Sequence, residues 1–231
     1  MCPVCVSQGV EVSGHLICRD CLGHLAQDHT LRREVAWESR GKIPRWRAFL
    51  TTWKDVILSP RAFFTGMEPE GGLLKPFIFA GICLAIGLLG SLMGVGEAGQ
   101  MVMGAGGGFL LPLLMVCLAP AAFVAAFAAT VLALHVLARG FGGNGSLRAT
   151  ARATAYGQAA AVAEIIPMVG GILALVLRLS LYGWGVPSAH SFSTKRSLAY
   201  YFTLVVITGG TIYLVAQLFM PLLDVAKPPA L

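Results

Sequence analysis

Five long apolar stretches fill the chain beyond residue 72, and glycine, proline or charged residues separate them. A helix that crosses a bilayer needs about 17–25 mostly apolar residues, because each residue rises about 1.5 Å. The pattern therefore predicts five membrane-spanning helices, of which the third is the least apolar: residues 73–95, 109–137, 149–166, 169–184 and 198–222.

The third and fourth stretches meet at a helix-breaking sequence, Pro167-Met168-Val169-Gly170-Gly171. Such a cluster of proline and glycine predicts a tight turn, so we expect these two helices to form a hairpin. Both are short for a full crossing. A re-entrant pair, which enters and leaves the membrane on the same side, is the alternative for them.

Charged residues gather ahead of the apolar stretches. The first 72 residues hold 17 of the 28 charged side chains, and residues 73–223 hold nine. The chain is 56% hydrophobic and 12% charged, whereas a soluble domain is about 25% charged. Lipid must therefore solvate most of the surface. A net charge of +6 would suggest nucleic acid for a soluble protein, but here no nucleic-acid partner is expected.

The positions of Lys and Arg predict how the helices are oriented. Nine basic residues precede the first stretch, the first connection and the hairpin have none, and the tail at 224–231 has only Lys227. The second and fourth connections, with their flanks, carry five more: Arg139, Arg148, Arg152, Lys195 and Arg196. Lys75 lies at the start of the first stretch and Arg178 within the fourth. Basic residues favour cytoplasmic loops. The alternation therefore predicts a cytoplasmic N-terminus, without a secretory signal, and an external C-terminus.

Residues 1–24 carry a metal-binding pattern. Cys2, Cys5, Cys18 and Cys21 form C-x2-C-x12-C-x2-C, in which each close pair can direct two thiolates at one ion. Residues 11–17 between the pairs alternate well enough for a short hairpin. We expect a zinc-ribbon-like module with one structural zinc. Disulfides, which a reducing cytosol disfavours, and free thiols are the alternatives.

A mixed-charge linker at residues 25–44, expected to be partly helical, leads to amphipathic helices at 45–72. Trp46, Phe49 and Trp53 fall on one helical face, and Arg45, Arg47 and Lys54 lie mostly elsewhere. Aromatic and basic side chains just before a span are typical of a helix in the lipid headgroup layer. A helix packed on the cytoplasmic side of the bundle is the alternative.

Two charges inside the predicted spans are candidates for chemistry. Glu164 and Arg178 flank the hairpin, and their depths differ by about 6 Å at 1.5 Å per residue, which an Arg side chain can bridge. An ion pair is therefore predicted, with either a structural or a transport role. His135, near the cytoplasmic end of the second stretch, is expected to make an interfacial hydrogen bond. His190 lies in a polar loop, where it would be solvated or contact lipid phosphates.

Several segments stand in a recognisable order along the chain: Trp53-Lys54-Asp55-Val56-Ile57-Leu58-Ser59-Pro60-Arg61-Ala62-Phe63-Phe64-Thr65-Gly66-Met67 with Lys75-Pro76, Leu134-His135-Val136-Leu137 with Phe141-Gly142-Gly143, Arg152-Ala153-Thr154-Ala155-Tyr156, Ile166-Pro167-Met168-Val169-Gly170-Gly171, and His190-Ser191-Phe192-Ser193-Thr194. In this order they resemble the Yip domain of the Ypt-interacting-protein family in its bacterial form. An N-terminal zinc ribbon is familiar in such bacterial proteins. Glu164 and Arg178 depart from the family's apolar or neutral pattern.

The resemblance implies a five-span membrane protein with a cytoplasmic N-terminus and no catalytic motif. Eukaryotic relatives act in vesicle trafficking with Rab-type GTPases, and the bacterial relatives have no settled activity.

Together these observations predict an all-α membrane protein with a five-helix bundle at 73–223, in the bacterial inner (plasma) membrane. We expect a non-enzymatic scaffold that docks a protein partner at its cytoplasmic face. A small-solute or proton-linked transporter or channel that uses Glu164 and Arg178, with His135 as a further candidate, is the alternative. Gly90 and Gly94 form a G-x-x-x-G pair, which serves close helix packing within one chain or in a homo-oligomer.

Overall fold

The computed structural model describes residues 10–12, 15–17, 35–39, 43–94 and 110–225. Near the N-terminus, β1 (Val10–Val12) and β2 (His15–Ile17) pair antiparallel, with Val10 opposite Ile17 and Val12 opposite His15. This is the hairpin that the alternation predicted. The rest of the described chain is helical apart from turns and short connections.

The helices follow the predicted stretches closely. Ahead of them lie α2 (Arg45–Leu58) and α3 (Pro60–Gly66). The apolar stretches form α4 (Leu74–Gly94), α6 (Leu110–Gly140), α7 (Leu147–Gly157), which continues as the 3-10 helix η3 (Gln158–Ile165), α8 (Gly170–Ala189) and α9 (Thr194–Val225). The largest boundary error is at α8, which continues five residues beyond 184 and through Pro187. Val186 is fully buried there, so core packing sustains the helix past a residue that favours its end.

Three of the described helices are long and apolar enough to cross a membrane: Ala121–Gly140, Gly170–Ala189 and Thr194–Leu218. The apolar part of α4, Leu74–Gly90, is somewhat shorter. The α7–η3 segment is not in this group. Its mean hydropathy is low over α7 because α7 carries Arg148, Arg152 and three polar hydroxyl side chains.

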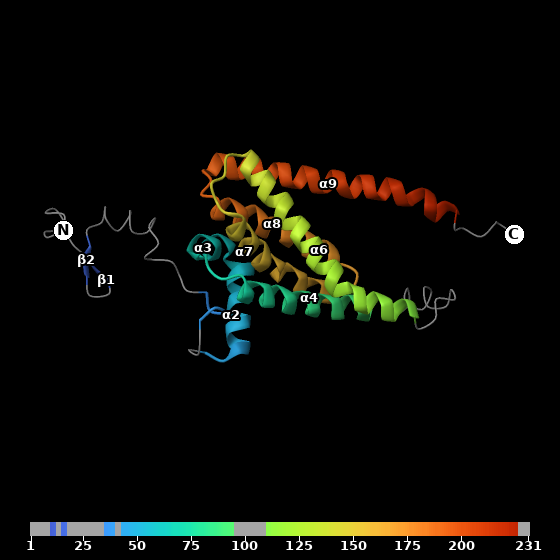
Figure 1. The fold of residues 1–231 in the computed structure, drawn as a ribbon, viewed down its shortest axis with the longest axis horizontal. Coiled ribbons are helices and arrows are strands. Elements are labelled where there is room, and N and C mark those ends of the chain that lie inside the picture. Colours follow the sequence, from blue (N-terminus) through green and yellow to red (C-terminus); the bar gives the residue numbers. More distant parts are fainter. Residues whose placement is uncertain (1–9, 13–14, 18–34, 40–42, 95–109, 226–231) are drawn as a thin grey trace.

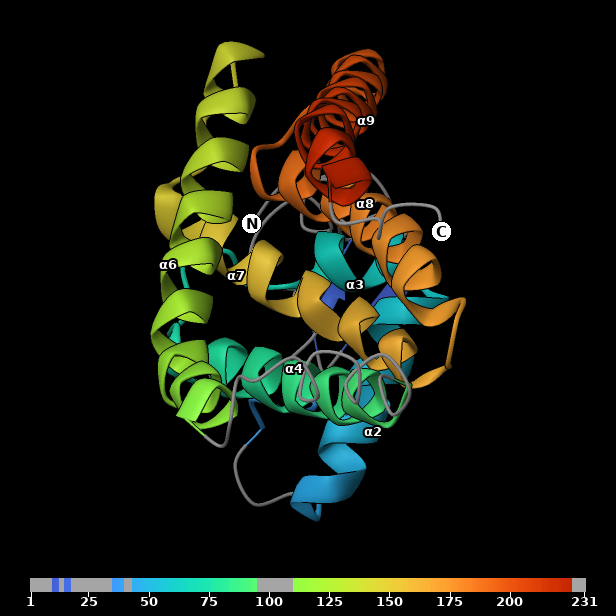
Figure 2. The same cartoon turned by 90° about the vertical axis from the view of Figure 1, so that its right-hand side faces the viewer.

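The α7–η3 segment is the centre of the molecule. Every residue from 149 to 161 is buried, and Figure 2 shows α7 enclosed by α4, α6 and α8. The ribbon in Figure 1 shows α4, α6, α8 and α9 running along the long axis around it. A helix that touches other helices on all sides does not meet lipid, and this explains why the third stretch is the least apolar.

Small residues allow the helices to approach η3 very closely. A Cβ atom at Gly90 would lie 2.2 Å from the Cα atom of Ile165, and one at Gly87 would lie 2.4 Å from the carbonyl oxygen of Ala161. Gly90 of the G-x-x-x-G pair therefore serves packing within the chain.

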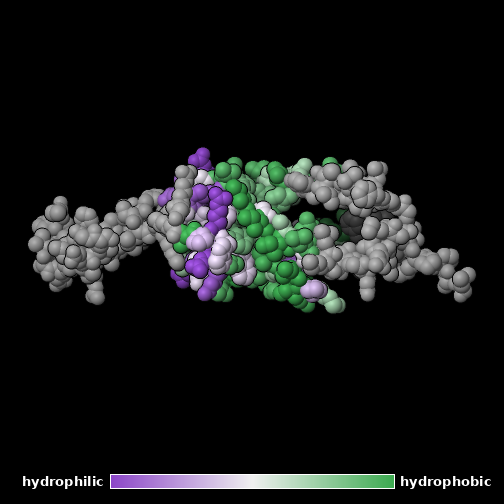
Figure 3. All heavy atoms as spheres, turned by 90° about the horizontal axis from the view of Figure 1, so that it is seen from below, coloured by the Kyte–Doolittle hydropathy of each residue, from purple (hydrophilic) through white to green (hydrophobic). Residues whose placement is uncertain are grey.

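Hydrophilic side chains gather in a band at one end of the helices, beside a continuous hydrophobic surface (Figure 3). Arg45, Arg47 and Lys54 of α2 are exposed. The described parts of the predicted linker, residues 35–39 and 43–44, contain a turn and a bend but no helix. The remaining linker residues, 25–34 and 40–42, lie outside the described part.

Candidate functional site

Residues 35–39, here called the anchor segment, are fixed against the end of the bundle that carries α2. Val35 is buried. The Trp37 indole donates to the Lys75 carbonyl at 2.7 Å, and its backbone N–H donates to Thr52 Oγ1 at 2.9 Å. The same indole ring lies 6.1 Å from the ring of Phe49. The segment is thus held by both polar and aromatic contacts.

Glu38 of the anchor segment binds the buried Arg152. The Arg152 Nη2 atom lies 2.6 Å from Glu38 Oε1, and the Tyr156 hydroxyl donates to the same oxygen at 2.5 Å. Arg152 Nη1 also donates to the carbonyl of Gly72, and Lys75 Nζ donates to the carbonyl of Glu38. The Arg152 side chain is fully buried and the Glu38 side chain is 21% exposed. A buried guanidinium requires such partners, because its desolvation is costly.

The sequence reasoning missed this site. It treated Arg152 only as a marker of the cytoplasmic side and placed Glu38 in a linker. The available signal was an arginine flanked by alanines inside a predicted span, which needs an acidic partner.

A second polar cluster joins α6, α7 and the turn after α8. Thr150 Oγ1 lies 3.0 Å from His135 Nδ1 and 2.8 Å from His190 Nε2. His190 Nδ1 accepts from the Gly145 N–H at 3.1 Å, so Nε2 carries the hydrogen and donates to Thr150. A hydrogen bond of His135, as predicted, is present. The solvated position predicted for His190 is wrong, since His190 is 2% exposed.

The environment of His190 keeps its ring neutral. Burial, followed by the neighbouring His135 and Arg139, lowers the pKa of His190 from 6.5 to about 4. The proton would also have to enter at Nδ1, which the Gly145 N–H occupies. The His190 ring is therefore uncharged at neutral pH, and its hydrogen bonds join the connection before α7 to the turn after α8.

At the hairpin end, the predicted ion pair is present. Arg178 Nη2 lies 3.1 Å from Glu164 Oε1, and the side chains are 27% and 26% exposed. Glu164 follows the end of the buried stretch in η3, and Arg178 lies in the middle of α8. The Arg178 Nε atom is buried without a hydrogen-bond partner in the described structure.

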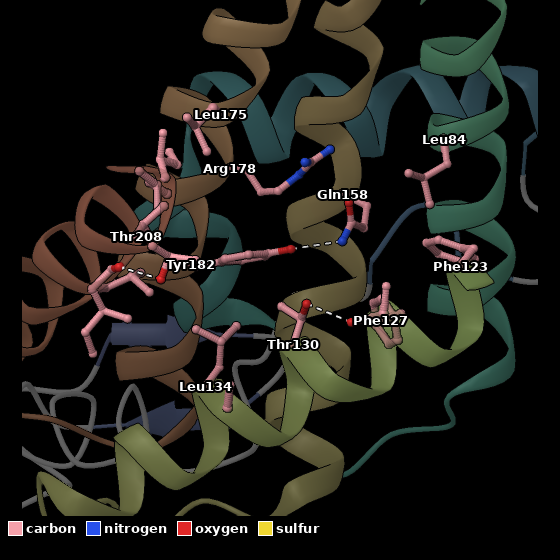
Figure 4. A pocket seen from close by; sticks show the side chains of 17 residues that line it. Leu84, Phe123, Phe127, Thr130, Leu134, Gln158, Leu175, Arg178, Tyr182 and Thr208 are labelled. Atoms are coloured by element: carbon pink, nitrogen blue, oxygen red, sulfur yellow. Dashed lines mark hydrogen bonds between the residues drawn. The ribbon is translucent and has the colours of Figure 1, made fainter. Parts of the chain in front are cut away.

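A cavity of about 590 Å³ adjoins Arg178 and lies between η3, α6, α8 and α9 (Figure 4). Gln158 Nε2 donates to the Tyr182 hydroxyl at 2.9 Å beside it. The other lining side chains are apolar except for three threonines. They are Leu84, Phe123, Ala126, Phe127, Thr130, Ala133, Leu134, Leu175, Leu179, Leu204, Ile207, Thr208, Thr211 and Ile212. Of the Glu164–Arg178 pair, only the positively charged Arg178 lines the cavity.

The aromatic face of α2 is divided between core and surface. Phe49 and Trp53 pack against the main hydrophobic core, and the Trp53 indole donates to the carbonyl of Ala159 at 3.0 Å. Trp46 is 61% exposed, with the Arg47 guanidinium 5.1 Å from its ring centroid. The C-terminal part of the aromatic face of α2 therefore packs on the bundle, and its N-terminal part, at Trp46, is exposed and can contact lipid.

The predicted zinc ligands Cys2, Cys5, Cys18 and Cys21 lie outside the described residues. Within the described ranges, no cluster of three or more His, Cys, Asp or Glu side chains could hold a metal ion. The described Cys83 is fully buried, as expected for a packing residue.

Comparison with known proteins gave one family. The model of the Yip1 domain matches residues 54–216, which is most of the chain. No curated protein matched the sequence, and no solved structure matched it. The match includes Arg152, Tyr156, His135 and His190 but begins after the anchor segment.

Proposed function

Because the chain belongs to the Yip1 domain family, we propose that this integral membrane protein is a non-enzymatic scaffold that organises membrane or docks a protein partner. Its N-terminal module would be the contact surface for that partner. The observation that carries the proposal is the anchor segment, which attaches the chain leading to that module to the bundle through Glu38, Trp37 and Val35. An anchored module is held beside the membrane surface.

We further propose that the bundle crosses the membrane five times. The α7–η3 segment has 11 α-helical and 8 3-10 residues. At about 1.5 and 2.0 Å per residue they extend about 32 Å, close to the thickness of the hydrocarbon layer. The basic residues of alternate connections support a cytoplasmic N-terminus, and the family's bacterial form supports the inner membrane.

The N-terminal module is proposed to bind one structural zinc ion through Cys2, Cys5, Cys18 and Cys21. The pairing of β1 with β2 supports this, because a hairpin brings its flanking segments together, as two C-x2-C pairs around one ion require. Four thiolates would close the coordination shell and leave no position for a reacting water. The metal would therefore stabilise the module's fold.

The test is a comparison of the full chain with a variant that lacks residues 1–22. We expect the deletion to abolish partner capture in pull-downs from membranes while the helical bundle unfolds as in the full chain. Cys18→Ser with Cys21→Ser should lose both zinc and capture, whereas Cys83→Ala, a change at a buried thiol, should keep both. Equal capture by the full chain and the deletion variant would contradict the docking role.

The transporter is the second candidate, and the cavity beside Arg178 is the observation that favours it. Under this alternative, Glu164 and Arg178 would pair and separate as a solute or proton passes. Liposomes with Glu164→Gln should then show altered flux relative to the unchanged chain. Flux that does not differ between the two would exclude the transport role for this pair.

A further inference from the structure

We propose that Arg152, Tyr156 and Lys75 form a binding site for a phosphate group, and that Glu38 of the anchor segment occupies this site as an internal ligand. The site would receive the phosphate of an anionic lipid headgroup or a soluble phosphate when the anchor segment leaves. The proposal does not depend on the partner-docking role or on which leaflet the site faces.

The donors of the site converge from two helices on one residue. Arg152 and Tyr156 lie one turn apart on α7, and both donate to Glu38 Oε1, at 2.6 and 2.5 Å. Lys75, in the first turn of α4, donates to the main-chain carbonyl of the same residue. A guanidinium, a phenol and an ammonium that converge on one residue make a typical set for binding phosphate oxygens.

Glu38 satisfies this set only in part. Arg152 and Lys75 carry two positive charges and Glu38 supplies one negative charge. The Arg152 Nε atom is buried and has no hydrogen-bond partner in the described structure. A phosphate group offers three or more acceptor oxygens and up to two negative charges. It therefore matches the cations better than a single carboxylate does.

The cations and the carboxylate come from different parts of the chain. Arg152, Tyr156 and Lys75 lie inside the matched domain, residues 54–216, whereas Glu38 precedes it. The domain thus builds the cationic site and an appended segment covers it. A fully buried arginine would be very costly without that cover, so departure of the segment requires a replacement anion.

The surroundings place the site near lipid headgroups. Trp37 of the anchor segment binds Thr52 of α2, and the same helix exposes Trp46, Arg45 and Arg47. Lys75 begins an apolar helix, so its ammonium lies where a hydrocarbon layer would end. Exposed tryptophan and arginine are typical of this layer.

The size of the expected effect follows from population arithmetic. If Glu38 covers the site in 90–99% of molecules, an external phosphate binds about 10–100 times more weakly than its intrinsic affinity. Glu38→Gln removes the competing charge and retains the size of the side chain. We therefore expect it to retain at least about tenfold more anionic lipid than the unchanged chain.

The experiment uses the full chain in nanodiscs of phosphatidylcholine with graded phosphatidylglycerol or phosphatidic acid. Native mass spectrometry counts retained lipids, and hydrogen exchange follows residues 35–39. The matched control is Glu70→Gln, because Glu70 accepts from Ser146 at 2.6 Å, whereas Arg152 donates to Glu38 and Gly72. Tyr156→Phe in the Glu38→Gln background removes one donor and keeps the ring that packs 5.1 Å from Phe63.

A second arm adds millimolar inorganic phosphate to phosphatidylcholine nanodiscs. Greater lipid retention in Glu38→Gln, reversed by Tyr156→Phe and absent in Glu70→Gln, would support a headgroup site. Protection by inorganic phosphate alone would support the site but reject the headgroup as its source.

If Glu38→Gln is destabilised, its melting temperature supplies the readout, since an anion that binds only the folded protein raises this temperature further as its concentration exceeds its Kd. The proposal is overturned if neither anionic lipid nor phosphate raises retention or melting temperature in Glu38→Gln beyond the Glu70→Gln control. Glu38 would then be a structural anchor only.

Discussion

Two Arg–Glu pairs lie at opposite ends of the buried α7–η3 segment, and they differ in nearly every respect. Glu38–Arg152 joins residues 114 apart in sequence at 2.6 Å, with a fully buried arginine and a tyrosine on the same carboxylate oxygen. Glu164–Arg178 joins residues 14 apart at 3.1 Å, and each side chain is about a quarter exposed.

The difference shows that the two pairs do different work. A buried charge that loses its partner is costly, whereas a partly exposed one can turn to water or headgroups. The first pair therefore attaches an otherwise separate segment to the bundle. The second is added to a hairpin that η3, α4 and α8 already hold by close packing, so we expect that packing to remain when the pair is removed.

The largest effect is expected from Glu38→Ala, which leaves Arg152 buried without its carboxylate. In zwitterionic mixed micelles the free energy of unfolding should fall by about 3 kcal/mol. SDS titration followed by circular dichroism measures it. The double variant Glu38→Ala with Arg152→Met should regain part of the loss, because no unpaired charge remains. If Glu38→Ala lowers the free energy of unfolding by less than about 1 kcal/mol, the Glu38–Arg152 pair contributes no more to stability than a partly exposed pair does.

Gly90→Ala tests whether packing, and not charge, holds the hairpin end. The added Cβ atom would lie 2.2 Å from the Ile165 Cα atom, so α4 and η3 must move apart. We expect this to lower the free energy of unfolding by about 2 kcal/mol. Gly81→Ala is the matched control, since Gly81 lies on the same helix with nothing within 4 Å of the added atom. It should be neutral or stabilising. Equal effects of the two substitutions would show that the close approach to η3 carries no stability.

Acidification should weaken the Arg152 end selectively. The pKa of His190 is about 4 in the folded protein and 6.5 by reference, so the unfolded chain takes up the proton first. The contribution of His190 is complete well above pH 6.5 and is lost as pH falls toward 4, by about 2 kcal/mol at pH 5. The pH dependence of SDS unfolding measures this. His190→Gln should flatten the curve between these values, and an unchanged curve would argue that His190 titrates normally.

The smallest effect is expected from Glu164→Gln. Because the pair is partly exposed and has a single contact, unfolding should become easier by less than about 1 kcal/mol. A double-mutant cycle with Arg178→Gln measures the coupling directly. Coupling above about 2 kcal/mol would mean that this pair is desolvated like the first, and the contrast between the two ends would be lost.

The sequence predicted the local features of the fold well. Helical stretches, the hairpin between β1 and β2, and the turn at Pro167 all depend on residues near one another. The same holds for Glu164 and Arg178, because a hairpin fixes which residues lie at equal depth. Their pairing could therefore be predicted from residue spacing alone.

What escaped prediction depends on residues far apart in the chain. Nothing local to Glu38 marks it as the partner of Arg152, and nothing local to His190 shows that Thr150 and Gly145 enclose it. The third stretch is the least apolar of the five because it is surrounded by protein. Only the tertiary arrangement shows this.

The anchor segment also sets how far the N-terminal module can reach. Fourteen residue steps separate Cys21 from Val35, and a chain cannot extend more than about 3.6 Å per residue. Cys21 therefore stays within about 50 Å of the bundle, whatever its path. A hemisphere of that radius confines one module to a local concentration in the millimolar range. A partner recruited to the same patch of membrane would meet the module repeatedly, so even weak contacts between them would be occupied.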